Sequence, residues 1–305
     1  MRVGIGIGGE GDLSNVLEQF TRAETAGFDA AWVSNIFGVD AITLLALAGR
    51  VTSRIELGTF VVPTYPRHPA ALAQQALTAS VASGGRFTLG IGLSHRVVIE
   101  NMFGLDYSKP IRHMREYLSV LLPLLAGESV QFRGEEYRVA AQMSVPGARR
   151  PDVIVAALGP QMLRLTGRMA DGTATWMGGA AYLEKTAIPA ITTAAADAGR
   201  PAPRIVAGFP VAVTSDAAGA REAASKQFAM YGQLPSYRAV LDIEGAADAS
   251  GVAIVGSEDE VETQIRHLAA IGVTDFNGSL FPVGEDRAVI GRSYELLAGL
   301  AKSGI

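Results

Sequence analysis

Short apolar segments alternate with longer segments of helical periodicity along the chain, eight times in succession. Because parallel strands need long and usually helical connections, this alternation indicates βαβ units and a parallel sheet. Eight such units predict an α/β fold, the (β/α)8 TIM barrel. The predicted strands are Val3–Gly8, Asp29–Ser34, Ile55–Val62, Arg86–Gly92, Asp152–Leu158, Gly172–Met177, Arg204–Thr214 and Val273–Phe281.

Local signals at the helix ends support this assignment. Pro69, Pro110 and Pro160 each stand where a helix should begin, the position at which a missing N–H costs least. Gly27 and Gly272 stand where a helix should end. The predicted helices are Leu13–Ala26, Ala41–Val51, Pro69–Ser83, Pro110–Ala126, Pro160–Ala170, Ala181–Ala198, Ala217–Tyr231, Asp259–Ile271 and Asp286–Lys302.

Two insertions lengthen the predicted barrel. After the fourth strand, Glu128–Val145 predicts a hairpin that turns at Gly134 and carries Phe132 and Tyr137 as apolar residues across its strands. After the seventh strand, Gly232–Gly251 forms the second insertion. These two insertions account for most of the residues beyond the roughly 250 of a typical barrel.

Composition limits the class of protein. No linker divides the chain, so residues 1–305 are predicted to form one domain. The net charge of −4 gives no basic field for nucleic acid, and the lack of cysteine excludes disulfides and thiolate chemistry. The longest apolar stretch, Tyr117–Gly127, is shorter than the ~18 residues of a membrane span. We therefore expect a soluble cytoplasmic protein without nucleic-acid or membrane partners.

Barrel enzymes carry their active sites at the carboxyl ends of the strands, so the strand assignment nominates residues directly. This rule ranks positions and names no reaction. The nominated segments are Gly8–Glu10, Ser34–Ile36, Phe60–Val62, Leu93–Arg96, Ala157–Pro160, Trp176–Gly179 and Phe281.

Two of these segments are suited to an anion. Gly90 and Gly92 precede Leu93 and Ser94, and small residues there let backbone N–H groups approach a phosphate. The alternative is that the glycines relieve crowding in the barrel. Gly159–Pro160 likewise stands at a helix N-terminus, which favours negative charge but is also an ordinary helix start.

Histidines are sparse. His95 lies just beyond a strand end, where a role as general acid or base competes with simple loop hydrogen bonding. His68 is interpreted as structural, and His113 and His267 as surface residues. The carboxylate pair Glu135–Glu136 is interpreted as a solvated turn.

Metal-binding and nucleophilic motifs are absent from the strand ends. The sequence contains no HExxH motif and no G-x-S-x-G elbow. The predicted strand ends are thus apolar, with few ionisable groups and a candidate phosphate loop. A site of this kind suits a bulky cofactor that brings its own reactivity.

The third strand ends irregularly. In "IELGTFVVPTYPRHP" the apolar run is interrupted by Gly58, and three prolines crowd its exit. We interpret Gly58 as the residue that lets the strand bend, and the prolines as stiffening the exit and starting the next helix.

The sequence resembles the luciferase-like superfamily and, within it, the coenzyme F420-dependent oxidoreductases. The segments that carry the resemblance are "GFDAAWVSN", "IELGTFVVPTYPRHPAALAQQALT", "GRFTLGIGLSHRVVIENMFG", "PIRHMREYL", "VAALGPQMLRLTGRMADGTATWM" and "GSEDEVETQIRHLAAIGVTDF". Together they cover nearly the whole chain.

The resemblance implies a homodimeric barrel with F420 lying across the strand ends. It implies a bulge with a cis Phe60–Val61 bond behind the deazaflavin ring, and phosphate and tail contacts in the two anion-friendly loops. The residues expected to contact the cofactor are Asn35, Phe60, Val61, Gly92, Leu93, Ser94, His95, Leu158, Gly159, Pro160 and Trp176.

The chain departs from the family's sugar-phosphate dehydrogenases. Those enzymes carry an Asp-His pair where this chain has Asn35–Ile36, and an acidic residue where it has His95. Both changes argue against glucose-6-phosphate oxidation. A pocket of Ile36, Phe37, Phe60 and Trp176 is better matched to reduction of a C=C or C=N bond in a small organic substrate, with His95 or water supplying the proton.

Two alternatives stay open at this point. One is a luciferase-like monooxygenase that uses FMN, since both cofactors occupy the same face of the barrel. The other is a non-catalytic flavin-binding barrel. The substrate itself is expected to contact variable loops, among them Glu10–Asp12, the region of Arg112 and Arg115, and the second insertion.

Overall fold

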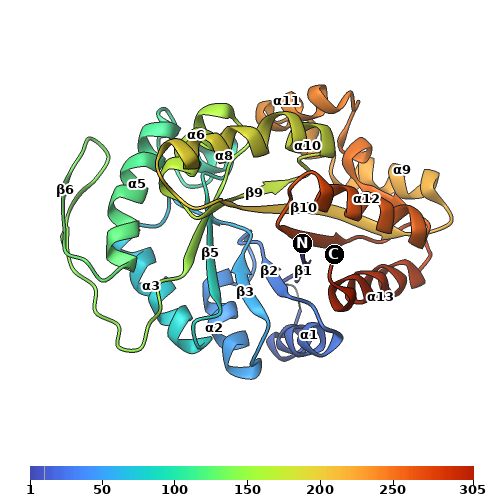
Figure 1. Cartoon of the computed structure of the whole chain (residues 1–305), viewed down its shortest axis with the longest axis horizontal. Coiled ribbons are helices and arrows are strands. Elements are labelled where there is room, and N and C mark those ends of the chain that lie inside the picture. The colour runs from blue at the N-terminus through green and yellow to red at the C-terminus, as the bar shows by residue number, and fades with distance from the viewer. Residues whose placement is uncertain (10) are drawn as a thin grey trace.

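The computed structural model describes residues 1–9 and 11–305, and its centre is a closed parallel barrel (Figure 1). Each strand pairs in parallel with the next in chain order, and the last pairs with the first, Arg2 opposite Asp275. The prediction of a (β/α)8 barrel is confirmed. The barrel strands are β1 (Arg2–Gly6), β2 (Ala30–Val33), β3 (Glu56–Thr59), β5 (Phe87–Gly92), β8 (Asp152–Ala156), β9 (Gly172–Trp176), β10 (Arg204–Val213) and β12 (Asp275–Leu280).

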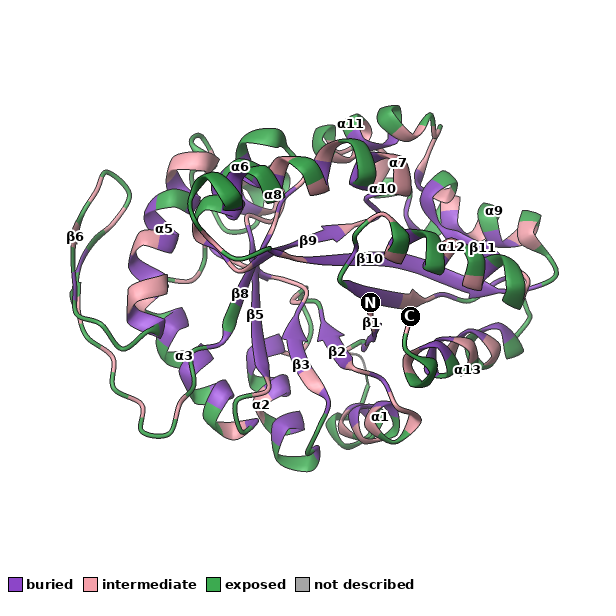
Figure 2. Cartoon of the chain, in the orientation of Figure 1, coloured by how far each residue is buried: buried purple, intermediate pink, exposed green. Residues whose placement is uncertain are grey.

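Helices surround the barrel and cover the strands, whose residues are mostly buried (Figure 2). Those that follow the eight strands and end the chain are α1 (Leu13–Ala26), α2 (Ala41–Val51), α3 (Pro69–Ala82), α5 (Pro110–Leu125), α6 (Pro160–Met169), α8 (Ile188–Asp197), α9 (Ala217–Gln227), α12 (Glu258–Ala270) and α13 (Ala288–Ser303). The predicted prolines begin α3, α5 and α6. Gly27 ends α1 in the left-handed conformation, at φ 100°.

Two predicted helices are divided in the structure. The segment predicted as Ala181–Ala198 consists of α7 (Ala180–Tyr182), a π-helical turn at Leu183–Ala187, and α8. The helix predicted to extend to Tyr231 breaks at Phe228, after which α10 (Ala229–Gly232) begins.

Several elements were not among the predicted helices and strands. They are α4 (Arg96–Asn101), α11 (Pro235–Glu244), a 3-10 turn at Ala249–Val252, and β11 (Ile254–Gly256), while the predicted strand Ile55–Val62 is divided into β3 and β4 (Val62–Pro63). The second insertion therefore contains the helix α11, and β11 after it pairs with the last residues of β10. Phe228, between α9 and α10, and Leu241 of α11 pack in a small core with Met177 and Phe281 at the strand ends.

The hairpin after the fourth barrel strand is confirmed as β6 (Val130–Arg133) and β7 (Arg138–Ala141). Gly134 lies at its turn, but Phe132 stands opposite Val139 and not Tyr137.

The hairpin turn is held by α5. The Glu116 carboxylate accepts hydrogen bonds from the backbone N–H of Glu135, Glu136 and Tyr137, at 2.8–3.1 Å. Arg112 forms salt bridges with both Glu135 and Glu136. The interpretation of this carboxylate pair as merely solvated is wrong, because Arg112 anchors both members.

Trp32 fills the barrel interior. A Cβ placed on Gly58 would lie 2.1 Å from the Trp32 ring, and one on Gly4 would lie 2.7 Å from its Nε1. Gly58 is therefore needed for packing against Trp32, a reason that the bend interpretation missed. Ile154 and Val206 complete the apolar contacts around the indole.

The amino ends of the strands are closed by charges. Arg204, at the start of β10, forms salt bridges with Glu56 (2.9 Å), Asp152 (3.1 Å) and Asp275 (2.7 Å). Arg2 adds a second cation, 2.6 Å from Glu56. Asp275 is almost fully buried, so the pairing offsets a large desolvation cost.

Candidate active site

The third barrel strand is interrupted where the site was predicted. β3 ends at Thr59, β4 begins at Val62, and the Phe60–Val61 bond between them is cis, as expected. Phe60 N donates to Val33 O at 2.7 Å, and Ser34 Oγ donates to Phe60 O at 2.8 Å. The end of β2 therefore holds the bulge at the carboxyl end of the barrel.

Gly90 and Gly92 make room for this bulge. A Cβ on Gly90 would lie 1.9 Å from the Thr59 carbonyl oxygen, and one on Gly92 would lie 2.7 Å from Val61 Cγ2. Crowding in the barrel therefore accounts for both glycines. The Gly92 carbonyl also accepts a hydrogen bond from Thr64 N, and a contact of Gly92 with a cofactor stays a prediction.

Phe60 and Trp176 meet at the centre of the barrel mouth. A Cβ on Gly208 would lie 2.7 Å from the Phe60 ring and 3.1 Å from the Trp176 ring, so glycine at this position lets both rings lie over β10. Trp176 Nε1 is buried and has no hydrogen-bond partner in the described part of the chain. The base of the site is thus apolar.

The end of the helix predicted as Ala217–Tyr231, together with the second insertion, contributes aromatic residues that sequence reasoning missed. Trp176 contacts the edges of Phe228 and Tyr231, at centroid distances of 5.9 and 6.3 Å. His95 lies edge-on to Tyr231 and Tyr237, at 6.3 and 6.1 Å. An aromatic run in a loop after a barrel strand was the available signal, because those loops carry barrel active sites.

His95 is the N-terminal residue before α4, and its side chain makes no capping hydrogen bond. Burial lowers its pKa below the usual 6.5, because desolvation disfavours the charged imidazolium. His95 is therefore mainly neutral at pH 7, with two ring nitrogens available for proton exchange.

The two loops predicted to favour anions are neighbours, since β5 pairs with β8. Ser94 adopts the left-handed conformation, at φ 60°. Gly159 precedes α6 with no side-chain cap, and a Cβ there would meet nothing within 4 Å. The start of α6 therefore lacks a side-chain cap and has open space beside Gly159, as an anion site requires. The Leu158 carbonyl accepts from Tyr182 Oη at 2.6 Å, which fixes this loop.

Asn35 organises the loop that follows β2. Its Oδ1 accepts from Ala41 N at 3.1 Å and from Arg67 Nη2 at 3.2 Å, while Arg67 also pairs with Asp40 at 2.6 Å. The backbone N–H of Asn35 donates to Val61 O at 3.4 Å. Asn35 therefore lies at the bulge, and its contact with a cofactor stays a prediction.

The remaining histidines divide as follows. His68 caps α3 by accepting from Ala70 N, and His267 is exposed on α12, both as predicted. His113 was predicted at the surface, which is wrong: it is buried, 2.9 Å from Thr64 Oγ1, and stacked on Tyr65. Burial lowers the pKa of His113 to about 4.

Apolar side chains surround the mouth. Ile36 and Phe37, in the loop after β2, are 69% and 61% exposed, and Phe37 lies 6.5 Å from Phe103, just after α4. Of the predicted pocket residues, Phe60 and Trp176 are brought together, whereas Ile36 and Phe37 stand at its rim. Glu10 lies outside the described residues.

No group of three or more His, Asp or Glu residues in the ranges 1–9 and 11–305 is arranged to hold a metal ion. No helix among the described residues is long and apolar enough to cross a membrane.

Comparison with known proteins gives consistent matches. A family model described as luciferase-like monooxygenase matches residues 1–275. An uncharacterised protein of Mycobacterium tuberculosis is 32% identical over 258 residues, which is 78% of this chain and 76% of that protein. A putative coenzyme F420-dependent oxidoreductase of the same species is 34% identical over 188 residues, covering 56% of this chain and 54% of its own length.

A solved structure has the same fold. The coenzyme F420-dependent tetrahydromethanopterin reductase of Methanopyrus kandleri superposes with a TM-score of 0.82 at 23% identity, over 97% of each chain. At 23% identity this similarity supports a shared fold alone.

Proposed function

The chain belongs to the luciferase-like monooxygenase family, and from that premise we propose that it is a coenzyme F420-dependent oxidoreductase. The proposed reaction is hydride transfer between the deazaflavin and a small organic substrate at the barrel mouth. We favour the reducing direction, with a C=C or C=N bond as acceptor. The named relatives that use F420 support this choice of cofactor.

One arrangement carries the proposal. The bulge at Phe60–Val61 and the Trp176 ring provide an apolar base, while the uncapped start of α6 at Gly159 lies at the neighbouring strand end. A cofactor with a flat ring and a phosphate needs these two surfaces side by side. The residues present therefore fit a deazaflavin or a flavin.

The chain's own residues have separable tasks in this proposal. The bound cofactor would supply or accept a hydride. Phe60 and Val61 would orient the ring, and the N–H groups after Gly159 would hold the phosphate. Tyr231 and Tyr237 would exclude water and keep His95 at the mouth, where its ring exchanges a proton with the substrate.

The lowered pKa of His95 limits its part in reduction. An imidazolium donor is populated only below that pKa, so His95 can supply the proton efficiently only in mildly acidic solution. Near pH 7 a water molecule held by the neutral ring is the better donor.

Cofactor binding tests the proposal directly. We expect the purified protein to perturb the fluorescence of F420 with a Kd in the micromolar range, and to bind FMN at least ten times more weakly. Reduced F420 should then be consumed in the presence of members of a panel of unsaturated compounds. Preference for FMN would favour the monooxygenase, and binding of F420 without turnover on any panel member would favour a non-catalytic barrel.

We also propose a small-molecule substrate, a homodimer and a cytoplasmic location. Light scattering on the purified protein tests the homodimer: a mass near twice the 31.9 kDa of one chain is expected. A monomer at working concentration would contradict the homodimer and leave the cofactor proposal standing.

A further inference from the structure

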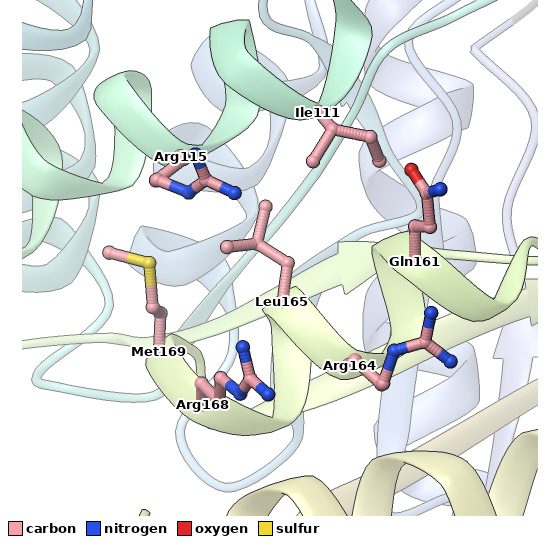
Figure 3. Close-up of a pocket in the computed structure, with 7 residues that line it drawn as sticks. All are labelled: Ile111, Arg115, Gln161, Arg164, Leu165, Arg168 and Met169. Atoms are coloured by element: carbon pink, nitrogen blue, oxygen red, sulfur yellow. The ribbon is translucent and has the colours of Figure 1, made fainter.

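A groove lies on the outer flank of the barrel, between α5 and α6 (Figure 3). Its volume is about 370 Å³. Arg115 of α5 faces Arg164 and Arg168 of α6 across the groove, and Leu165 lies between them. Three cations therefore surround one apolar base.

These three arginines have no paired counter-charge among the residues that the structure describes. Guanidinium groups stay protonated at any physiological pH. Within the described residues, none of the three forms a salt bridge or a side-chain hydrogen bond, whereas Arg200, which follows α8, pairs with Asp171. Arg164 and Arg168 are also spaced i,i+4, where like charges destabilise a helix. Repulsion within the arginine cluster thus lowers the stability of the fold, and a negatively charged ligand would offset this loss.

The groove begins at the proposed phosphate site. Gln161, in the first turn of α6, lines its upper end next to Gly159 and Pro160. Arg168 is seven residues beyond Gln161, or about 10 Å at the rise of an α-helix. A ligand held by its phosphate at the start of α6 would therefore pass the arginines if it continued down this flank.

We propose that this groove binds an acidic chain that continues from the cofactor's phosphate, and this proposal rests on the function proposed above. Coenzyme F420 ends in a chain of glutamates beyond its phosphate, whereas FMN ends at the phosphate. Guanidinium groups recognise carboxylates through paired hydrogen bonds. The α5–α6 groove is then a second binding subsite, outside the barrel mouth, that selects F420 over FMN.

The test compares two cofactor forms. One is F420 with several glutamates, and the other is the same molecule truncated after the phosphate-linked group. We expect the wild-type protein to bind the tailed form about ten times more tightly at low ionic strength, because each exposed ion pair contributes little but three act together. In ~1 M salt, where the screening length falls to about 3 Å, this advantage should disappear.

Substitutions locate the effect. The triple variant Arg115→Gln, Arg164→Gln, Arg168→Gln should bind both forms equally, with the affinity of the truncated form unchanged. A matched control removes the same charge from exposed arginines on other elements, Arg22→Gln, Arg50→Gln and Arg133→Gln, and should keep the tenfold difference.

The outcomes separate the two proposals. Equal binding of both forms by the wild type, or a tenfold difference that survives in the groove variant, overturns the groove subsite and leaves the proposed function intact. Failure of both forms to bind overturns the proposed function and this subsite together. Loss of truncated-form affinity in the groove variant would assign the arginines to the phosphate and overturn the tail assignment.

Discussion

The two ends of the barrel are built on opposite principles. At the amino ends of the strands, Arg204 and Arg2 neutralise Glu56 and Asp275, and the carboxylate of Asp275 is almost fully buried. At the carboxyl ends, aromatic rings are exposed, the Trp176 N–H has no partner in the described chain, and α6 begins without a side-chain cap.

The amino end of the barrel therefore contributes to stability, whereas the carboxyl end has groups that are available to a ligand. Paired charges at the amino end satisfy one another and have no capacity left for a ligand. The carboxyl end leaves apolar surface and hydrogen-bond donors unmatched, which is the usual division of a barrel enzyme. Substitutions at the two ends should therefore affect different measurements.

The largest effect is expected at the amino end. Arg204→Met leaves Glu56 and Asp275 with Arg2 alone, and should lower the free energy of unfolding by about 3 kcal/mol, since breaking a buried ion pair leaves unpaired charge. Denaturant unfolding measures this. Arg266→Met, which removes an exposed i,i+4 pair on α12, should cost less than about 0.5 kcal/mol. Equal losses in the two variants would show that the charge cluster has no special role.

At the carboxyl end, His95→Ala should act on turnover alone. We expect kcat to fall about 100-fold at pH 6, as for loss of a general acid, with F420 affinity within about threefold and stability unchanged. His267→Ala, an exposed histidine, is the control. Parallel losses of kcat and F420 affinity would mean that His95 binds the cofactor and does not donate the proton.

The pH dependence of the reduction rate, measured in the wild type and in His95→Ala, tests the same role of His95. Because burial lowers the pKa of His95, donation by its imidazolium predicts a rate of reduction that falls as pH rises through this lowered pKa. The profile should flatten in His95→Ala. An identical profile in both proteins would assign the proton to water.

Glu24→Gln should have a smaller effect, at the amino end. Burial alone would raise the pKa of Glu24, but the N–H groups of Ile55, Arg54 and Ser53 lower it to about 2. Its stabilisation is therefore complete above pH 4.5 and is lost as pH falls toward 2.

Unfolding at two pH values tests this. At pH 7 the Glu24→Gln variant should be less stable by about 1 kcal/mol, after allowance for solvent screening. Near pH 2.5 the difference from wild type should nearly vanish. Glu18→Gln, exposed on the same helix, should show no difference at either pH, and a constant difference at both would contradict the ionisation argument.

The smallest effect on stability is expected at the rim. Phe37→Ser should leave the free energy of unfolding within about 0.5 kcal/mol, because the ring is 61% exposed, while raising substrate KM a few-fold. Val51→Ser, an exposed apolar residue at the other end of α2, should change neither. An unchanged KM for Phe37→Ser would remove the rim from the binding surface.

Periodicity was enough to predict the barrel, because each strand and helix carries its own pattern. Leu13–Ala26 and Ala41–Val51 are helices at the same residues in the structure. The resemblance to a family then located the bulge, where Phe60–Val61 is cis.

What the sequence could not show depends on contacts between distant residues. Gly58 was assigned to a bend because its partner, Trp32, lies on a neighbouring strand. His113 was assigned to the surface because two of the rings that bury it, Tyr65 and Tyr137, lie outside its helix. Tyr237 went unnoticed because α11 lies in an insertion for which no helix was predicted.

Closure of the barrel by β1 and β12 also has a consequence for biosynthesis. Arg2 and Asp275, which pair across this seam, are more than 270 positions apart. During translation β1 and its neighbours must wait, with an unpaired edge, until nearly the whole chain has emerged. Such edges invite association with other chains, and pairing over so long a loop is slow. Yield of native protein should therefore depend on chaperone supply and on slow synthesis more than the stability of the finished barrel would suggest.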